Sequence, residues 1–260
     1  MSTAVARGFG WIAIVRLGLV QAAIGAIVML ATSLLNRVMV VEYALAAAIP
    51  AGLVAWHYAV QLARPLWGHG SDRGRKRTPW IGGGMAVLAG GALLAVRATT
   101  LMPGSALVGG VLAVAAFAMI GFGVGAAGTS MLALLASGVR PERRAAAAAV
   151  TWTMMIAGIV IAAGVAGALL DPFSEARLTA VAGSIALAAL GVALIAIWRL
   201  EPTNPVDFSD KHSSDAPGFA EALREIMQET AARRFTVLIF VSMLAYSMQD
   251  LILEPFAGLV

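Results

Sequence analysis

The chain has 260 residues, of which 60% are hydrophobic and only 12% carry a charged side chain. Soluble globular domains are about 45–50% apolar and about 25% charged, so this composition excludes an ordinary soluble enzyme, a disordered protein and a nucleic-acid-binding module. The net charge is only +4, and the absence of cysteine excludes thiol nucleophiles, disulfides and cysteine-bound metal clusters.

Long apolar runs predict an all-α, polytopic membrane protein. A helix needs about 20 apolar residues to cross a bilayer, and these runs lack the alternation of barrel strands. Six complete spans are expected, at residues 17–35, 43–62, 79–96, 106–136, 146–170 and 178–198.

A polar stretch at residues 201–234 separates these spans from a seventh apolar run. Its apolar residues between 219 and 230 recur at helical spacing, which predicts an amphipathic helix on the membrane surface, the alternative being a solvated linker helix. We therefore predict a six-helix bundle (1–200), a linker (201–234) and a seventh helix (235–260). This seventh helix is expected to begin a C-terminal half that is missing from the chain.

Lysine and arginine are distributed unevenly between the two sides that these spans define. Of 18 such residues, 15 fall on one side, and Arg37, Arg97 and Arg177 fall on the other. Loops rich in these residues stay in the cytoplasm, so the N-terminus and the linker are predicted to be cytoplasmic.

A glycine-rich basic motif joins the second and third spans, with the sequence GHGSDRGRKR at residues 68–77. It resembles the signature loop of the major facilitator superfamily, with one residue fewer before Gly74, and it implies the N-terminal six-helix bundle of that fold. Glycines permit a tight turn, and an aspartate can latch one helix bundle to another. The alternative is a basic loop with no gating role. The candidate loop residues are Gly68, Ser71, Asp72, Arg73, Gly74 and Arg75.

Several longer stretches resemble a narrower group, the PucC/LhaA family of phototrophic bacteria. They are LLNRVMVVE (34–42), HYAVQLARP (57–65), WGHGSDR (67–73), TPWIGG (78–83) and YSMQDLILEPF (246–256). The resemblance implies a role in assembling light-harvesting complexes in the intracytoplasmic photosynthetic membrane. It also implies that bacteriochlorophyll is the pigment. The implied partners are membrane lipid and either antenna polypeptides or a reaction-centre antenna complex. Family members are longer, so an N-terminal portion is expected.

His57 is the only histidine inside a predicted span, and Gln61 and Arg64 follow on the same helical face. With the resemblance in view, a neutral imidazole is a candidate axial ligand for the magnesium of bacteriochlorophyll, bordered by Trp56 and Tyr58. The alternatives are a packing hydrogen bond from His57 to Gln61 or to a neighbouring helix, and a role at the lipid headgroups.

Charged residues also lie near the predicted outer ends of the first and seventh spans. Arg37 and Glu42 occupy the first, and Asp250 and Glu254 take a similar place in the seventh. A charge in hydrocarbon costs about 2.5–3.5 kcal/mol on insertion scales, so we predict that Arg37 pairs with Asp250 or Glu254. The alternative is that each side chain extends to the lipid headgroups.

The sequence offers no catalytic constellation and no metal-ligand spacing. The glycines at 123, 125 and 128 spell a dinucleotide-binding motif, but they lie inside an apolar run and predict close helix packing instead. We therefore expect a chaperone of pigment or apoprotein and no enzyme. The alternatives are a structural subunit of a photosynthetic complex, or a secondary transporter of an organic solute. The transporter's path would be lined by Arg37, His57, Gln61 and Asp250.

Overall fold

The computed structural model describes residues 8–73, 76–201, 221, 224 and 227–257, with the backbone alone at 69, 70, 72, 73, 243, 244 and 246–257. Throughout these residues the regular structure is helical, and no strand occurs among them. The chain divides into two compact units, residues 1–208 and 209–260. The fold is therefore all-α, as the long apolar runs predict.

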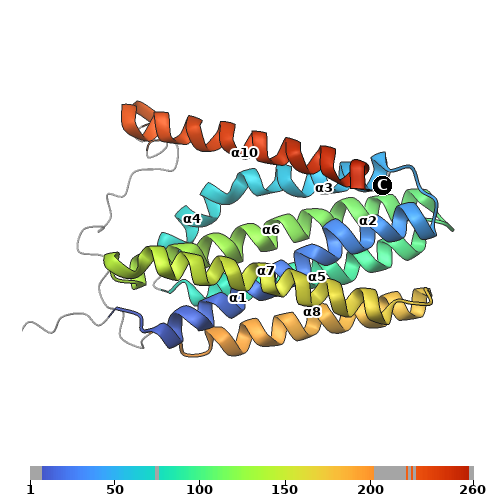
Figure 1. Cartoon of the computed structure of the whole chain (residues 1–260), viewed down its shortest axis with the longest axis horizontal. Helices are drawn as coiled ribbons and strands as arrows, with labels where there is room; N and C mark the ends of the chain where they lie inside the picture. Colours follow the sequence, from blue (N-terminus) through green and yellow to red (C-terminus); the bar gives the residue numbers. More distant parts are fainter. Residues whose placement is uncertain (1–7, 74–75, 202–220, 222–223, 225–226, 258–260) are drawn as a thin grey trace, which may run out of the picture. The chain divides into compact units, whose positions relative to one another are not determined.

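The long helices of the first unit run beside one another, with short helical segments between some of them (Figure 1). In chain order they are α1 (Trp11–Met29), η1 (Leu30–Leu34), α2 (Leu35–Arg37), η2 (Val38–Glu42), α3 (Ala48–Val60), η3 (Gln61–Ala63), α4 (Arg64–Arg73), α5 (Thr78–Leu101), α6 (Ala106–Gly138), η4 (Pro141–Arg143), α7 (Arg144–Leu169) and α8 (Glu175–Ile197). The second unit contains α10 (Thr230–Ala257).

Five helical segments of the described chain are long and apolar enough to cross a membrane. The first runs without interruption from Trp11 to Glu42, and the others correspond to α5, α6, η4 with α7, and α8. The protein is therefore a polytopic membrane protein. The predicted division into bundle, linker and seventh helix stays a prediction.

The second predicted span, residues 43–62, differs from the structure at both ends. Its helix α3 begins at Ala48 and covers 13 residues, and after the 3-10 turn η3 the chain continues as α4 to Arg73. Pro65 has no backbone N–H to donate to the carbonyl of Gln61, so the α-helical ladder cannot continue through this point. The predicted span thus yields only the 13-residue α3, and the stretch that follows it folds as a separate short helix, α4.

Glycine allows the closest helix contacts of the first unit. A Cβ added at Gly123 of α6 would lie 2.6 Å from the backbone N of Leu88 on α5, and one at Gly84 of α5 would lie 2.6 Å from the backbone N of Ala127 on α6. Helices α1 and α7 meet in the same way at Gly158, where an added Cβ would lie 2.2 Å from the carbonyl oxygen of Ala22. Small residues let backbones approach closely where lipid supplies no hydrophobic driving force between helices.

Polar contacts fasten the helix ends of this bundle. Arg16 Nε donates to the carbonyl of Ala196 at 2.8 Å, which ties α1 to the end of α8. The Glu201 carboxylate accepts hydrogen bonds from the backbone N–H groups of Arg77, at 3.0 Å, and Thr78, at 2.8 Å. These donors open α5 and have no intrahelical acceptor, so Glu201 serves as the cap of that helix.

Two predicted features fall on parts of the chain that the structure does not describe in side-chain detail. The expected amphipathic helix between residues 219 and 230 lies largely outside the described residues, and the side chains of Asp250 and Glu254 are also outside them. Arg37 lies on α2 with an exposed side chain, and Glu42 ends η2. The pairing of Arg37 with the seventh helix therefore stays a prediction.

Candidate functional site

A row of polar side chains follows one face of α3 and passes through η3 into α4. His57 is only 1% exposed, and its Nε2 lies 2.7 Å from the Gln61 amide nitrogen, which donates to it. The Gln61 carbonyl oxygen in turn accepts a hydrogen bond from the exposed Arg64 guanidinium. We call these three residues the polar chain. In the polar chain, the amide of Gln61 connects a charged guanidinium at the surface to a buried imidazole by two hydrogen bonds.

The two aromatic neighbours of His57 are exposed, whereas His57 itself is buried. Trp56 is 43% exposed and donates from its indole nitrogen to the Val114 carbonyl of α6 at 3.1 Å. Tyr58 is 58% exposed, and its ring meets the imidazole edge-on with 5.0 Å between centroids. The imidazole is therefore buried between helices, while its two aromatic neighbours lie at the surface. This geometry fits a packing hydrogen bond better than it fits a pigment ligand.

Two glycines of α6 bring the α3–α4 segment close. A Cβ at Gly121 would lie 2.7 Å from the His57 carbonyl oxygen. A Cβ at Gly125, one turn further, would lie 3.1 Å from Cδ1 of Trp67. Gly121 thus lets the α3 backbone approach, whereas Gly125 leaves room for an indole ring.

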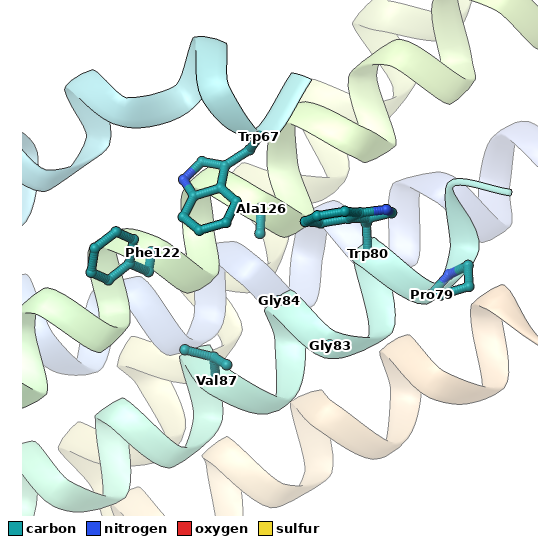
Figure 2. A pocket seen from close by; sticks show the side chains of 8 residues that line it. All are labelled: Trp67, Pro79, Trp80, Gly83, Gly84, Val87, Phe122 and Ala126. Atoms are coloured by element: carbon teal, nitrogen blue, oxygen red, sulfur yellow. The ribbon is translucent and has the colours of Figure 1, made fainter. Parts of the chain in front are cut away.

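That indole forms one wall of a pocket among α4, α5 and α6, with a volume of about 350 Å³ (Figure 2). Trp67 comes from α4, Trp80 and Val87 from α5, and Phe122 from α6. The lining residues, which we call the aromatic pocket, are Trp67, Pro79, Trp80, Gly83, Gly84, Val87, Phe122 and Ala126. None of them carries a charge, so the pocket suits an apolar ligand.

The aromatic rings of the pocket stand at steep angles to one another, as Figure 2 shows. Trp67 and Phe122 meet edge to face at 88° with centroids 5.6 Å apart, and Trp67 and Trp80 are inclined at 57° with centroids 6.3 Å apart. The indole nitrogen of Trp67 is buried and has no hydrogen-bond partner among the described residues. This nitrogen lies on the side of the ring that packs against Gly125 of α6, so the pocket itself is lined by the apolar part of the indole.

The signature motif is partly helical. Helix α4 continues to Arg73, so Gly68, Ser71, Asp72 and Arg73 belong to the helix and the turn predicted there is shorter. Ser71 is fully buried and donates to the Gly68 carbonyl at 3.0 Å. Gly74 and Arg75 lie outside the described residues. The latch role of this motif stays a prediction.

The turn that leads into α3 has its own anchor. Tyr43 donates from its hydroxyl to Glu175 Oε1 at 3.2 Å and meets Phe173 edge-on. Burial first, and then the neighbouring Glu175 carboxylate, raise the pKa of Tyr43 to about 12. In the folded chain the tyrosine therefore stays neutral at pH values at which a free tyrosine is ionised.

Sequence reasoning missed the aromatic pocket and the Glu201 cap. Trp67 and Trp80 flank the basic motif on either side, and this spacing could have indicated that the two indoles meet across the turn. The contribution of Phe122 depends on how α6 is rotated against α4, which hydropathy does not report. Glu201 looked like the first residue of a linker.

Comparison with known proteins gives a consistent set of relatives. A family model described as "PUCC protein" matches residues 34–260. A protein of Rhodobacter capsulatus named "Bacteriochlorophyll synthase 44.5 kDa chain" is 51% identical over 256 residues, which cover 96% of this chain and 58% of that one. "Protein PucC" of Cereibacter sphaeroides is 30% identical over 257 residues, covering 94% of this chain and 56% of that one.

A further relative, an "uncharacterized protein in puhA-bchM intergenic region" of Rhodobacter capsulatus, is 33% identical over 261 residues. It is covered to 54% of its length, so the chain spans a little over half the length of the curated relatives it matches. No solved structure matches the chain.

Proposed function

We propose, because this chain belongs to the PUCC protein family, that it takes part in assembling photosynthetic antenna complexes by binding bacteriochlorophyll without altering it chemically. The observation that carries the proposal is the aromatic pocket, an open, uncharged pocket of about 350 Å³ on the helices of a membrane protein. Pockets that hold small molecules are concave, mostly apolar and provided with few polar groups. The name of the relative that is 51% identical connects this family with the same pigment.

We propose binding without catalysis because the pocket provides an apolar surface for packing and contains no reactive side chain. Its lining consists of aromatic, aliphatic, proline and glycine residues. Such a lining holds a hydrophobic pigment by packing and cannot transfer protons or act as a nucleophile. The partners that follow from this role are nascent antenna polypeptides, which would receive pigment from a protein held in the same membrane.

Absorption spectroscopy of the purified chain tests the proposal. The chain is produced in a pigment-making phototrophic host, extracted in mild detergent, and compared with an unrelated membrane protein purified in parallel. We expect pigment bands to elute with the chain alone, and the extracted pigment to have the mass of unmodified bacteriochlorophyll. A colourless chain would contradict pigment binding, and a pigment of altered mass would contradict the non-enzymatic role.

We also propose that the N-terminus faces the cytoplasm, as the distribution of lysine and arginine predicts. The chain has no cysteine, so single cysteines can be labelled without background. Ser105 precedes α6 and Glu142 follows it, and both are exposed. A membrane-impermeant maleimide should label Ser105→Cys in spheroplasts and Glu142→Cys only in inverted vesicles. The reverse pattern would overturn the proposed orientation.

A further inference from the structure

The start of α1 and the start of α7 meet at one end of the first unit (Figure 1). The Phe9 N–H donates to the carbonyl of Gly138 at 2.8 Å, which holds the start of α1 against the turn between α6 and α7. Both helices belong to segments long enough to cross a membrane, Trp11–Glu42 and Pro141–Leu169, and both segments begin here. This end of the two helices therefore lies at the level of the lipid headgroups.

Three exposed arginines occupy the turn between α6 and α7, at Arg140, Arg143 and Arg144. The Arg143 N–H donates to the Arg140 carbonyl at 2.9 Å, which closes one tight turn and brings these two residues together. The Arg143 guanidinium lies over the ring of Trp11, 5.9 Å from its centroid. Arg140 lies beside the same segment, because a Cβ added at Gly8 would be 3.0 Å from Arg140 Cγ. We call Arg140, Arg143 and Trp11 the arginine corner.

The positive charge of the arginine corner is not neutralised by the described part of the chain. The guanidinium groups of Arg140 and Arg143 make no hydrogen bond or ion pair with a described residue, whereas Arg16 and Arg77 donate to main-chain carbonyls of α8 and α6. The first turn of α1 has no acidic residue, and Glu142 is the one carboxylate in the described turn. Three guanidinium groups and one carboxylate leave this turn with a net charge of +2, which favours an anionic ligand.

An apolar strip leads from the arginine corner along α1. Trp11, Ile12, Val15 and Leu19 are exposed, and their spacing places them on one side of the helix. Arg143 covers the Trp11 ring, so the charge lies at the end of the strip that is nearest the headgroups. A small anion would contact only the arginines, whereas a phospholipid would contact both the arginines and the strip. Tryptophan is also enriched at this depth of the membrane.

We propose that the arginine corner is a binding site for an anionic phospholipid. A guanidinium group donates in pairs to phosphate oxygens and can stack on an indole at the same time. The phosphate would lie beside Arg140 and Arg143, and an acyl chain would follow Ile12 and Val15. A lipid bound there would connect the start of α1 to the turn before α7. The site is separate from the aromatic pocket and does not depend on pigment binding.

Native mass spectrometry of the full chain in a neutral detergent tests this site. The protein is titrated with phosphatidylglycerol and, separately, with phosphatidylcholine of the same acyl chains. The variants are Arg143→Gln alone and Arg143→Gln combined with Arg140→Gln, and both positions are exposed, so the fold should be kept. Arg97→Gln is the matched control, because Arg97 of α5 is also exposed and its side chain has no polar contact with a described residue. Inorganic phosphate is then added to the lipid-bound wild type as a competitor.

We expect the wild type and Arg97→Gln to bind phosphatidylglycerol about tenfold more tightly than phosphatidylcholine. Arg143→Gln should reduce this preference about threefold, and the double variant should remove it. Inorganic phosphate should displace little lipid, because the acyl chain contributes to binding. Equal binding of the two lipids by the wild type, an unchanged preference in the double variant, or an equal loss in Arg97→Gln and Arg143→Gln would overturn the proposal. Complete displacement by inorganic phosphate would show a site for a free anion and would overturn it as well.

Discussion

Helix α6 presents two contrasting sides to its neighbours. Toward α5 it makes the most extensive contact of any two described elements, closed by glycines whose replacement would drive side chains into backbone. Toward α3 and α4 it meets a broken helix and the polar chain. The aromatic pocket lies where α4 faces both α5 and α6: five of its eight lining residues come from α5, two from α6, and Trp67 comes from α4. The contrast indicates that α5 and α6 form a tightly packed frame, which also supplies most of the pocket lining, and that the α3–α4 segment closes the pocket through Trp67.

The largest effect should come from breaking the frame. In Gly123→Leu the new side chain meets the α5 backbone, with Cβ 2.6 Å from the Leu88 nitrogen. We expect a loss of about 3 kcal/mol in the free energy of unfolding, because neither helix backbone can move without losing its other contacts. Thermal unfolding in detergent measures it. Gly110→Leu in the same helix, where an added Cβ meets nothing within 4 Å, should change stability little. Equal stability of both variants would show that the contact is not tight.

A smaller effect is expected in the polar chain. Gln61→Leu leaves the buried His57 Nε2 without its donor, and we expect a loss of about 1 kcal/mol. His57→Phe combined with Gln61→Leu should cost less than the sum of the two single variants, since the orphaned group is then absent. A double-mutant cycle of unfolding free energies measures this coupling. Strict additivity would show that the two side chains do not interact.

Gly125→Ala should separate binding from stability. Its new Cβ would lie 3.1 Å from Trp67 Cδ1, so the indole must shift by a few tenths of an ångström while the backbone stays in place. We expect stability to change by less than about 0.5 kcal/mol and pigment affinity to fall about twofold. Gly128→Ala, where nothing lies within 4 Å of the added Cβ, should leave both unchanged. A Gly125→Ala chain as destabilised as Gly123→Leu would remove the distinction between the two sides of α6.

The smallest effect concerns the turn that anchors α3. Because the pKa of Tyr43 is raised from 10.0 to about 12, folding favours its neutral form. Its contribution to stability is complete below pH 10 and is lost as the pH rises through about 12. Melting temperatures measured from pH 9 to 12 should therefore fall more steeply for the wild type than for Tyr43→Phe. Parallel curves would show that the tyrosine is not held by Glu175.

Most of the helices could be predicted from the sequence because hydrophobic runs of membrane length have few alternative structures. The predicted range 106–136 corresponds to α6 at Ala106–Gly138, and 146–170 corresponds to α7 at Arg144–Leu169. Hydropathy was less accurate at the second span, where α3 begins five residues later than predicted and covers only 13 residues. It also gave no indication that the chain continues past Pro65 as the helix α4, because that stretch is polar.

The site was only partly predictable for a related reason. Helical spacing placed His57, Gln61 and Arg64 on one face, and the structure joins them by hydrogen bonds. The aromatic pocket depends on the packing of three separate helices, and the sequence does not specify how far each is rotated. Its two tryptophans belong to stretches that resemble the family, but the sequence does not indicate that they line the same pocket.

Tryptophan emission can report directly whether pigment binds at the aromatic pocket. The chain has six tryptophans, of which four lie outside the pocket, at Trp11, Trp56, Trp152 and Trp198. Replacing these four by phenylalanine leaves Trp67 and Trp80 as the reporters, and the converse chain keeps the four and replaces the two. On titration with bacteriochlorophyll, we expect the pocket pair to be quenched almost completely, with saturation at one pigment per chain, and the four tryptophans outside the pocket to be quenched only in part. Equal quenching of both chains, or quenching that never saturates, would show that the pigment dissolves in the surrounding lipid and does not occupy this wall.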